Sequence, residues 1–175
     1  MLKRMKTVMP ILLVAVLFAV SVVPAFAGPK GNTIVDVAIA VNSEGDYAGM
    51  FDTLIAAVLA ADPAVLATLT GNGQHTVFAP TDDAFEAIGL TPDNIGNPDI
   101  IPQDVLTAVL LYHVAPGRRY SGDVLESDRI RTLLMGKDGF VMQDGGVLNG
   151  YATIIVTDVP AANGIIHAID GVLLP

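Results

Sequence analysis

The stretch TVFAPTDDAF, Thr76 to Phe85, carries the clearest fold signal in this chain of 175 residues. Its first residues predict a strand that runs into Pro80. Thr81 then suits the N-cap of a helix, because its hydroxyl can accept a bond from a free backbone N–H of the first turn. Asp82 and Asp83 follow in that turn, where the helix dipole favours negative charge. The stretch therefore predicts a strand, a tight turn and a helix in immediate succession.

Helical patterns precede this stretch. The segment 32–41 has Asn32 or Thr33 as a candidate N-cap, but its apolar run also fits a buried strand, because periodicity alone does not separate the two. Asp62 and Pro63 predict a shorter helix, with Asp62 as cap and Pro63 in the first position. Between these segments, apolar residues at helical spacing predict one face of an amphipathic helix: Phe51, Leu54, Ile55, Val58 and Leu59.

From about Ile130 onward the pattern changes to short β-branched runs separated by turns. The turns are typical of β-hairpins and lie at Gly136–Gly139, Asp144–Gly146, Asn149–Gly150 and Asn163–Gly164. Helices thus cluster early and strands late. This order predicts the α+β class with largely antiparallel strand pairing.

The first 27 residues have the three parts of a secretory signal peptide. Lys3, Arg4 and Lys6 give a basic start, 11–20 is an unbroken apolar run, and Ala25-Phe-Ala27 forms an Ala-x-Ala cleavage site. A retained membrane anchor is the alternative, since no charge falls between positions 7 and 29, but prolines bracket the apolar run and favour cleavage. We expect a signal peptide at 1–27, a short leader at 28–31, one domain at 32–175, and no stable membrane anchor after cleavage.

Beyond the signal peptide the chain is strongly acidic. Three of its nine Lys and Arg residues lie in positions 1–27 and none of its 18 Asp and Glu residues do, which leaves a formal charge of −12. Such a surface repels nucleic acid, and its simplest role is to keep the protein hydrated. Because the chain has no cysteine, the domain must fold on its hydrophobic core without disulfides.

The sequence contains no pattern typical of catalysis or metal binding. His75, His113 and His167 lack the spacing that places two imidazoles on one element. The serines that follow the signal peptide lie outside any Gly-x-Ser-x-Gly turn, and glycine-rich loops for dinucleotides or phosphates are missing. We therefore expect neither an enzyme nor a bound cofactor or metal.

Three segments together resemble the fasciclin (FAS1) family. They are TVFAPTDDAF, then LLYHVAPG at Leu110–Gly117, then NGIIHAIDGVLLP at Asn163–Pro175, and their order and spacing match the two boxes and the Tyr-His motif of that family. The resemblance covers 32–175. It implies a compact wedge of antiparallel strands flanked by several helices, in a secreted or surface-displayed protein associated with cell adhesion.

The resemblance also implies candidate interaction residues. In adhesive members the Tyr-His motif and an Asp-aliphatic pair before the last box are implicated in receptor contact, and the matching residues here are Tyr112, His113, Asp158 and Val159. The pair is Asp-Val here in place of the usual Asp-Ile. Ala115 stands where a second Val is usual.

The residues around His113 favour a structural role for it. In the helix predicted from Pro102, Val105, Val109 and His113 share one apolar stripe, so the imidazole faces the core and needs partners. Its place near the helix C-terminus favours the protonated form. Following the family pattern, we expect Asp82 to bond His113. By the same helical spacing the hydroxyl of Tyr112 should reach solvent, and His167 should be half-buried in a strand.

The leading interpretation is a non-catalytic module for adhesion or protein interaction, secreted or held in the periplasm, the medium or the cell-envelope surface. Its partner would be an extracellular protein or polysaccharide. The alternative is an extracellular carrier of an apolar molecule such as a carotenoid or lipid, because some fasciclin-like proteins bind carotenoids. A third interpretation is an accessory subunit of an envelope complex.

Overall fold

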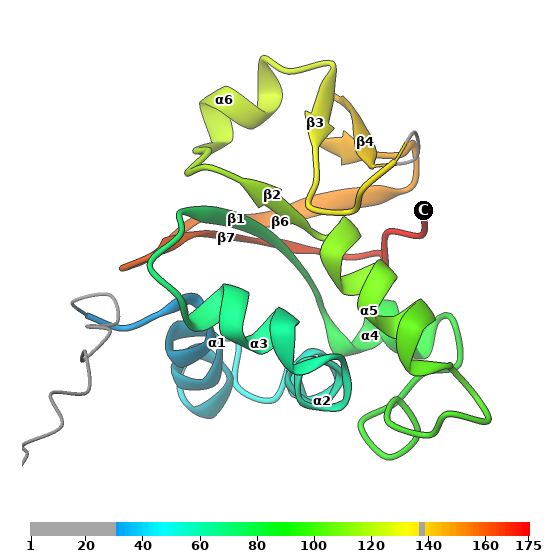
Figure 1. Ribbon diagram of the computed structural model, residues 1–175. Helices are drawn as coiled ribbons and strands as arrows, with labels where there is room; N and C mark the ends of the chain where they lie inside the picture. Colours follow the sequence, from blue (N-terminus) through cyan, green and yellow to red (C-terminus); the bar gives the residue numbers. More distant parts are fainter. Residues whose placement is uncertain (1–30, 137–138) are drawn as a thin grey trace, which may run out of the picture.

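The computed structural model describes residues 31–136 and 139–175, in which most helices come early in the chain and most strands late (Figure 1). The predicted signal peptide and all but the last residue of the predicted leader lie outside the described residues. The helices are α1 (Ile34–Ser43), α2 (Asp52–Ala60), α3 (Pro63–Thr70), α4 (Asp82–Glu86), α5 (Gln103–Tyr112) and α6 (Ser121–Leu125). The strands are β1 (His75–Pro80), β2 (Val114–Pro116), β3 (Arg129–Arg131), β4 (Phe140–Asp144), β5 (Val147–Leu148), β6 (Ala152–Ala161) and β7 (Gly164–Ile169).

The helix starts follow the local capping signals. The segment after residue 33 is a helix, and Thr33 closes a capping box with Asp36 at its start. Asp62 caps α3 by accepting a bond from the Ala64 backbone N–H, with Pro63 in the first turn. Thr81 caps α4 in the same way by accepting from Ala84. These cap predictions at Thr33, Asp62 and Thr81 are confirmed.

The strands form one mixed sheet in the order β2-β1-β7-β6-β5-β4-β3. All neighbouring pairs are antiparallel except β1 and β7, which run parallel from the pair His75 and Gly164 to the pair Pro80 and Ile169. The predicted turns at Asp144–Gly146, Asn149–Gly150 and Asn163–Gly164 do connect consecutive strands, and the α+β class is confirmed. The turn predicted at Gly136–Gly139 includes two positions that lie outside the described residues. The parallel pair was not predicted, because it joins the first strand to the last one.

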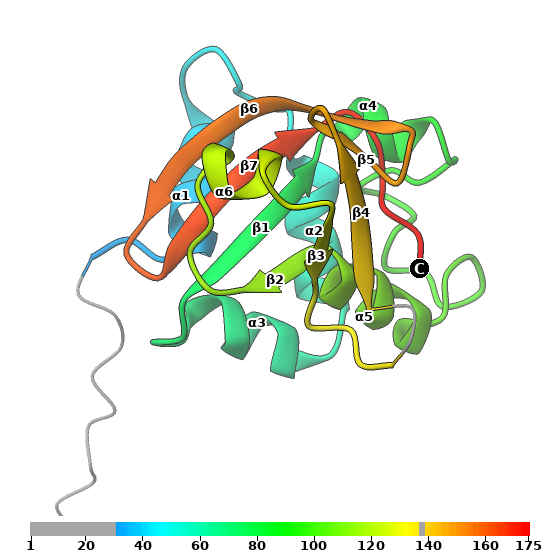
Figure 2. The ribbon, with the colours of Figure 1, turned by 90° about the horizontal axis from the view of Figure 1, so that it is seen from above.

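The sheet lies between two layers of different make-up. In Figure 1, helices α1, α2 and α3 cover one side of the central strands, while β3, β4 and α6 lie on the other side. Seen from above, β4 and β3 extend over the end of the sheet beside β2 (Figure 2). The Leu133 backbone N–H donates to the Val114 carbonyl at 2.7 Å, which brings the chain after β3 next to β2. The sheet therefore curls, so that β3 at one end of the strand order comes close to β2 at the other end.

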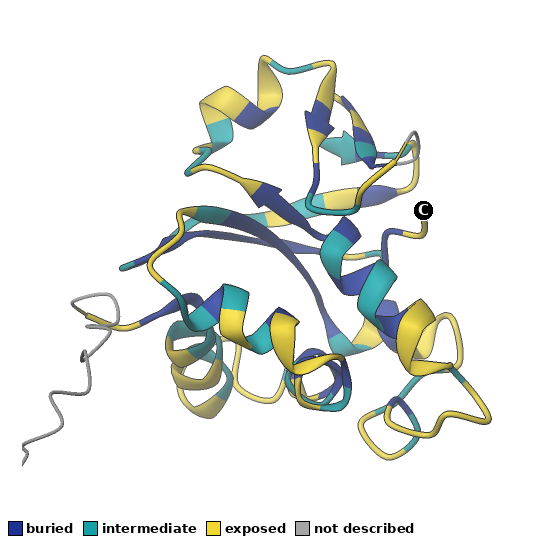
Figure 3. Cartoon of the chain, viewed as in Figure 1, coloured by how far each residue is buried: buried dark blue, intermediate teal, exposed yellow. Residues whose placement is uncertain are grey.

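Each layer encloses its own hydrophobic core. The central strands are buried on both faces (Figure 3). The core under the helices includes Leu54, Phe85, Leu110 and Ile166. The second core, between the central strands and β3–β5, includes Phe78, Tyr112, Ile130, Val141, Leu148, Ile169 and Leu173.

Two residues that the sequence placed toward the core are exposed instead. Leu59 on α2 is 68% exposed and Val105 on α5 is 46% exposed. The buried face of α2 is narrower than predicted, and its inner residues are Thr53, Leu54, Ala57 and Val58. Apolar periodicity therefore overestimated how far the packed face extends around these helices.

In the described part of the chain, no single helix has the length and apolar character needed to cross a membrane. Helices α2 and α3 together would satisfy that test by composition and length, but they are bent by 117° at the break between them.

Candidate binding site

His113 lies at the junction of the two cores, where α5 ends and β2 begins. Its side chain is 2% exposed. The Leu173 backbone N–H donates to Nε2 at 2.9 Å, so Nε2 is the unprotonated nitrogen and Nδ1–H donates to the Val109 carbonyl at 2.7 Å. Burial lowers the pKa of His113 to about 4. The ring is therefore neutral at physiological pH, and the protonated form expected from the helix dipole is wrong.

Asp82 does not bond His113, so this predicted pair is wrong. The Asp82 carboxylate accepts bonds from the backbone N–H groups of Asp52 at 3.2 Å and Thr53 at 2.8 Å. These groups begin α2, whose formal N-cap residue Phe51 has no side-chain oxygen to offer. Asp82 thus caps a neighbouring helix, while both ring nitrogens of His113 have backbone partners.

Tyr112 is buried, and the prediction that its hydroxyl reaches solvent is wrong. The side chain is 4% exposed. Its hydroxyl donates to the Phe140 carbonyl at 2.8 Å and accepts a bond from the Asn149 side-chain amide at 3.0 Å. Tyr112 therefore ties α5 to β4 and to the turn before β6, and it offers no free group to a partner.

Asp158 lies at an irregular point of β6, where the pairing with β7 shifts register between Val156 and Val159. Its backbone is left-handed, with φ 61°. The carboxylate accepts bonds from the backbone N–H and the hydroxyl of Ser121, at 2.7 and 2.5 Å. The Ser121 hydroxyl is the main cause that lowers the pKa of Asp158. This predicted contact residue holds β6 to the start of α6.

His167 completes this group on the neighbouring strand. It is fully buried, deeper than the half-buried position expected. Nδ1 accepts a bond from the Asp158 backbone N–H at 3.2 Å, and Nε2–H donates to the Arg119 carbonyl at 3.0 Å. The ring also stacks on Phe78, with centroids 5.8 Å apart. Burial lowers the pKa of His167.

Ser121, His167 and Asp158 are thus close together without the arrangement of a catalytic triad. In a triad the serine hydroxyl donates to the histidine and the histidine to the acid. Here the Ser121 hydroxyl donates to the carboxylate, and both nitrogens of His167 bond backbone groups. Among the described residues, no three His, Asp or Glu side chains gather in a way that could hold a metal ion.

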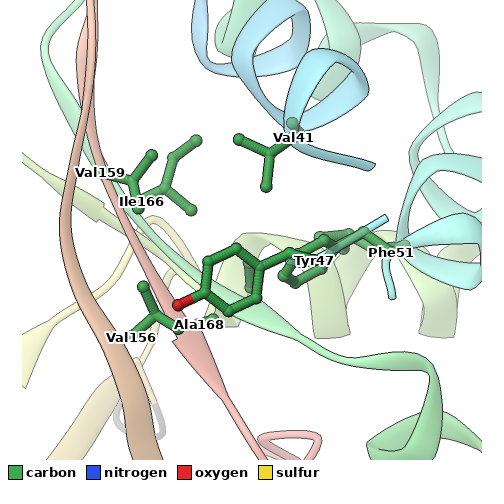
Figure 4. A pocket seen from close by; sticks show the side chains of 10 residues that line it. Val41, Tyr47, Phe51, Val156, Val159, Ile166 and Ala168 are labelled. Atoms are coloured by element: carbon green, nitrogen blue, oxygen red, sulfur yellow. The ribbon is translucent and has the colours of Figure 1, made fainter. Parts of the chain in front are cut away.

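The remaining candidate site is an apolar hollow beneath α1. One pocket of about 30 Å³ opens between α1, the loop after it, and strands β6 and β7 (Figure 4). A second cavity of about 90 Å³ lies between α1, α2 and the central strands, and includes His113 in its lining. Four residues line both: Ala38, Leu54, Ala79 and Ile166. The two hollows are therefore neighbours that share one wall.

Val159, predicted as a surface contact, lines the outer pocket with Val41, Tyr47 and Phe51. In Figure 4 its side chain lies beside Ile166 and opposite Val41. The sequence analysis missed this pocket, because its lining comes from four separate segments. One signal was available: 34–41 is almost wholly apolar, yet Ile34 is the sole buried residue of α1. An apolar helix that packs so shallowly leaves space beneath it.

The start of α1 is nevertheless firmly attached. The Asn163 side chain accepts a bond from the Ile34 backbone N–H at 2.8 Å and donates to the carbonyls of Leu69 at 2.7 Å and Gly71 at 2.9 Å. After α1 the chain is mostly exposed. Gly45 and Gly49 there adopt positive φ angles that favour glycine. Helix α1 is thus fixed at one end and loosely packed along its length.

The fold is that of a FAS1 domain. A solved FAS1 domain pair from the insect cell adhesion molecule Fasciclin I superposes on this chain with a TM-score of 0.59. The match has 17% sequence identity and covers 82% of this chain and 51% of the other. At this level of identity the likeness concerns the fold.

The Fasciclin domain family matches residues 49–175, and the chain belongs to this family. Protein sll1483 of Synechocystis is 39% identical over 157 residues, which are 89% of this chain and 80% of that protein. Transforming growth factor-beta-induced protein ig-h3 of Sus scrofa is 32% identical over 149 residues, 84% of this chain but 20% of that protein. The immunogenic protein MPB70 of Mycobacterium bovis is 34% identical over 106 residues, 59% of this chain and 51% of that protein.

Proposed function

We propose that this protein is a non-catalytic interaction module that acts outside the cytoplasm and binds an extracellular protein or polysaccharide through its surface. One observation carries the proposal. The groups best suited to chemistry, on Ser121, His167, Asp158 and His113, bond one another or the backbone inside the fold. Residues committed to internal bonds hold the fold, which leaves recognition to the exposed faces.

The likeness to a cell adhesion molecule and the predicted signal peptide support the same proposal. Export would place the acidic surface in contact with the envelope or the medium. The Tyr-His motif then serves the fold, and its loss would abolish binding only by unfolding the domain.

The test is a binding assay of the exported protein on envelope fractions of its own host, with hydrolysis of ester, peptide and glycoside substrates measured in parallel. We expect saturable binding and no turnover. A Ser121→Ala variant serves as the control for hidden catalysis. Turnover that this variant loses would contradict the proposal, and so would the absence of any envelope binding.

The hollow beneath α1 favours a second function, that of a carrier for an apolar molecule. Its walls are apolar apart from the His113 ring and the Tyr47 hydroxyl, and an apolar site of this kind holds hydrocarbon without wetting. The space of about 90 Å³ admits a few methylene groups. A longer chain or polyene would enter only if α1 lifted from the sheet.

Extraction of the exported protein into organic solvent tests the carrier function. A carrier releases an apolar compound, seen by absorbance or mass spectrometry. Ala38→Phe would add a ring to the wall that both hollows share and should remove that compound while the protein stays folded. The exposed substitution Ile88→Phe adds the same ring outside the hollow and should leave the compound in place. An extract equal to the solvent blank would exclude the carrier.

A further inference from the structure

The outer face of β3 and β4 carries a group of residues that neither the fold nor the α1 hollow uses. We call Arg129, Arg131, Phe140 and Met142 the arginine patch. In the strand register Arg129 lies opposite Met142, and Arg131 lies opposite Phe140. The residues between them, Ile130 and Val141, are fully buried. Because side chains alternate along a strand, all four patch residues share the outer face.

The two arginines are held side by side over one aromatic ring. The guanidinium carbon of Arg129 is 4.9 Å from the centre of the Phe140 ring, and that of Arg131 is 5.0 Å from it. Both arginines are exposed, and Met142 beside them is 55% exposed. A ring face attracts cations and limits their motion. The patch is therefore a partly ordered pair of positive charges with an apolar neighbour.

This pair is unusual in so acidic a chain. Among the described residues, neither guanidinium makes an ion pair or a hydrogen bond, although the chain holds 18 carboxylates. Asp128 precedes Arg129 in sequence, and Asp144 shares the outer face of β4; neither carboxylate is bonded to the pair. Two like charges near one ring repel each other, and in the described part of the chain no carboxylate forms an ion pair with either of them. Their forked N–H donors are free to bind another molecule.

We propose that the arginine patch binds an acidic segment of a protein partner. One or two carboxylates of that segment bond the forks of Arg129 and Arg131, and an apolar side chain packs on Met142. The inference names the partner chemistry of the interaction module proposed above and rests on that proposed function. Arginine, methionine and aromatic residues together are typical of the central part of protein interfaces.

The charge distribution favours a short protein segment over an anionic polysaccharide. The described patch has two cations, whereas the chain after the signal peptide has a formal charge of −12. A long polyanion would extend beyond the patch across acidic surface and be repelled there. Repulsion between exposed charges fades over about 8 Å at physiological salt. One or two partner carboxylates bound at the patch are therefore little affected by the acidic residues elsewhere on the surface.

The test is a binding titration of the full exported protein with an immobilised peptide of alternating Glu and Leu, at low and at physiological salt. A Gln–Leu peptide of the same length is the uncharged control, and polygalacturonate is the polysaccharide probe. We expect the Glu–Leu peptide to bind at least about tenfold tighter than the Gln–Leu peptide, since charge-assisted bonds are the stronger kind. Polygalacturonate should bind more weakly than the acidic peptide.

Three variants locate the binding. The pair Arg129→Ala with Arg131→Ala should weaken peptide binding about tenfold or more. The pair Arg129→Lys with Arg131→Lys keeps the charge but loses the fork, so it should bind at an intermediate level. Met142→Ser should weaken binding by a smaller factor. All these side chains are exposed, and unchanged thermal unfolding of each variant confirms that the fold is kept.

The proposal is overturned if the two peptides bind equally well. It is also overturned if the Ala double variant and the Lys double variant both bind the Glu–Leu peptide as the unsubstituted protein does. Tighter binding of polygalacturonate overturns it in favour of a polysaccharide. The envelope assay separates this failure from failure of the proposed function. If the Ala pair binds envelope fractions as the unsubstituted protein does, only the patch is wrong; if neither protein binds them, the proposed function itself fails.

Discussion

The imidazole of His113 satisfies two buried backbone groups, the Val109 carbonyl of its own helix and the Leu173 N–H near the C-terminus. His113→Leu should lower the free energy of unfolding by about 2 kcal/mol, because the buried Leu173 N–H loses its acceptor. Urea unfolding measures this loss. His75→Leu is the matched control: His75 is partly exposed, its Nδ1 has no partner in the described structure, and we expect a much smaller effect. Equal effects of the two substitutions would contradict this role of His113.

The same residue predicts how stability depends on pH. Burial lowers the pKa of His113 to about 4 from its ordinary value of 6.5, so between these values the unfolded chain binds a proton that the folded chain excludes. Its contribution to stability is therefore complete above pH 6.5 and declines as the pH falls toward 4, by about 3 kcal/mol in all. Burial lowers the pKa of His167 as well, so this residue also makes the folded protein less stable as the pH falls.

Urea unfolding at a series of pH values tests this dependence. The protein should lose stability steadily from pH 6.5 to 4, and His113→Leu should show a shallower profile that keeps the loss due to His167. A profile of unchanged slope in His113→Leu would mean that other groups cause the acid loss.

For single residues, the sequence predicted where a side chain lies better than it predicted the hydrogen-bond partners of that side chain. The apolar stripe of α5 correctly placed His113 inside. Its acceptor and donor are backbone groups, and one of them lies 60 positions away, so no residue type could mark them. Tyr112 was misplaced for another reason. Helical spacing assumes one packed face, whereas α5 lies between two cores, and Tyr112 belongs to the second.

Between elements, two side chains connect helices to distant parts of the chain. Asp82 caps α2 from the start of α4. Asp82→Ala should lower the free energy of unfolding by about 1 kcal/mol, as is typical for loss of an N-cap. The Thr53 amide, which loses its acceptor, should then exchange hydrogen faster than the amides of α5. Asp83→Ala, in the same turn, is the control and should change both quantities little. Normal protection of Thr53 in Asp82→Ala would exclude the cap.

Asn163 joins α1, α3 and the turn between β6 and β7 through three hydrogen bonds. Asn163→Asp keeps the acceptor for the Ile34 N–H but removes both donors and buries a charge facing two carbonyls. We expect it to lower the free energy of unfolding by about 3 kcal/mol. Asn149→Asp, at another predicted turn, is partly exposed and should cost less. Thermal unfolding compares the two, and a smaller loss for Asn163→Asp would contradict the bridging role.

The elements themselves follow from local chemistry. Caps at Thr33, Asp62 and Thr81, and the turns between consecutive strands, act within a few residues and were predicted. The parallel pairing of β1 with β7 depends on which strands meet after the whole chain has folded. The bulge at Asp158 is of the same kind, because Ser121 and His167 stabilise it from other elements.

Over the whole molecule, the three sequence segments that resemble the family meet in space. The first and third form the parallel pair β1 and β7, the second supplies α5 and β2, and His113 bonds the chain end near Leu173. The hollow under α1 and the arginine patch lie in different layers, on opposite sides of the central strands. A carrier function and a binding surface would therefore use separate parts of the domain.

Hydrogen exchange of the Leu173 backbone amide tests most directly whether the Tyr-His motif and the last box build the interior together. The amide lies close to the C-terminus, where exchange is usually fast. Because it donates to buried His113, we predict exchange only through global unfolding, at the same free energy as the amides of β7. Exchange as fast as in an unfolded peptide would show that the chain end does not pack on His113, and would contradict the account.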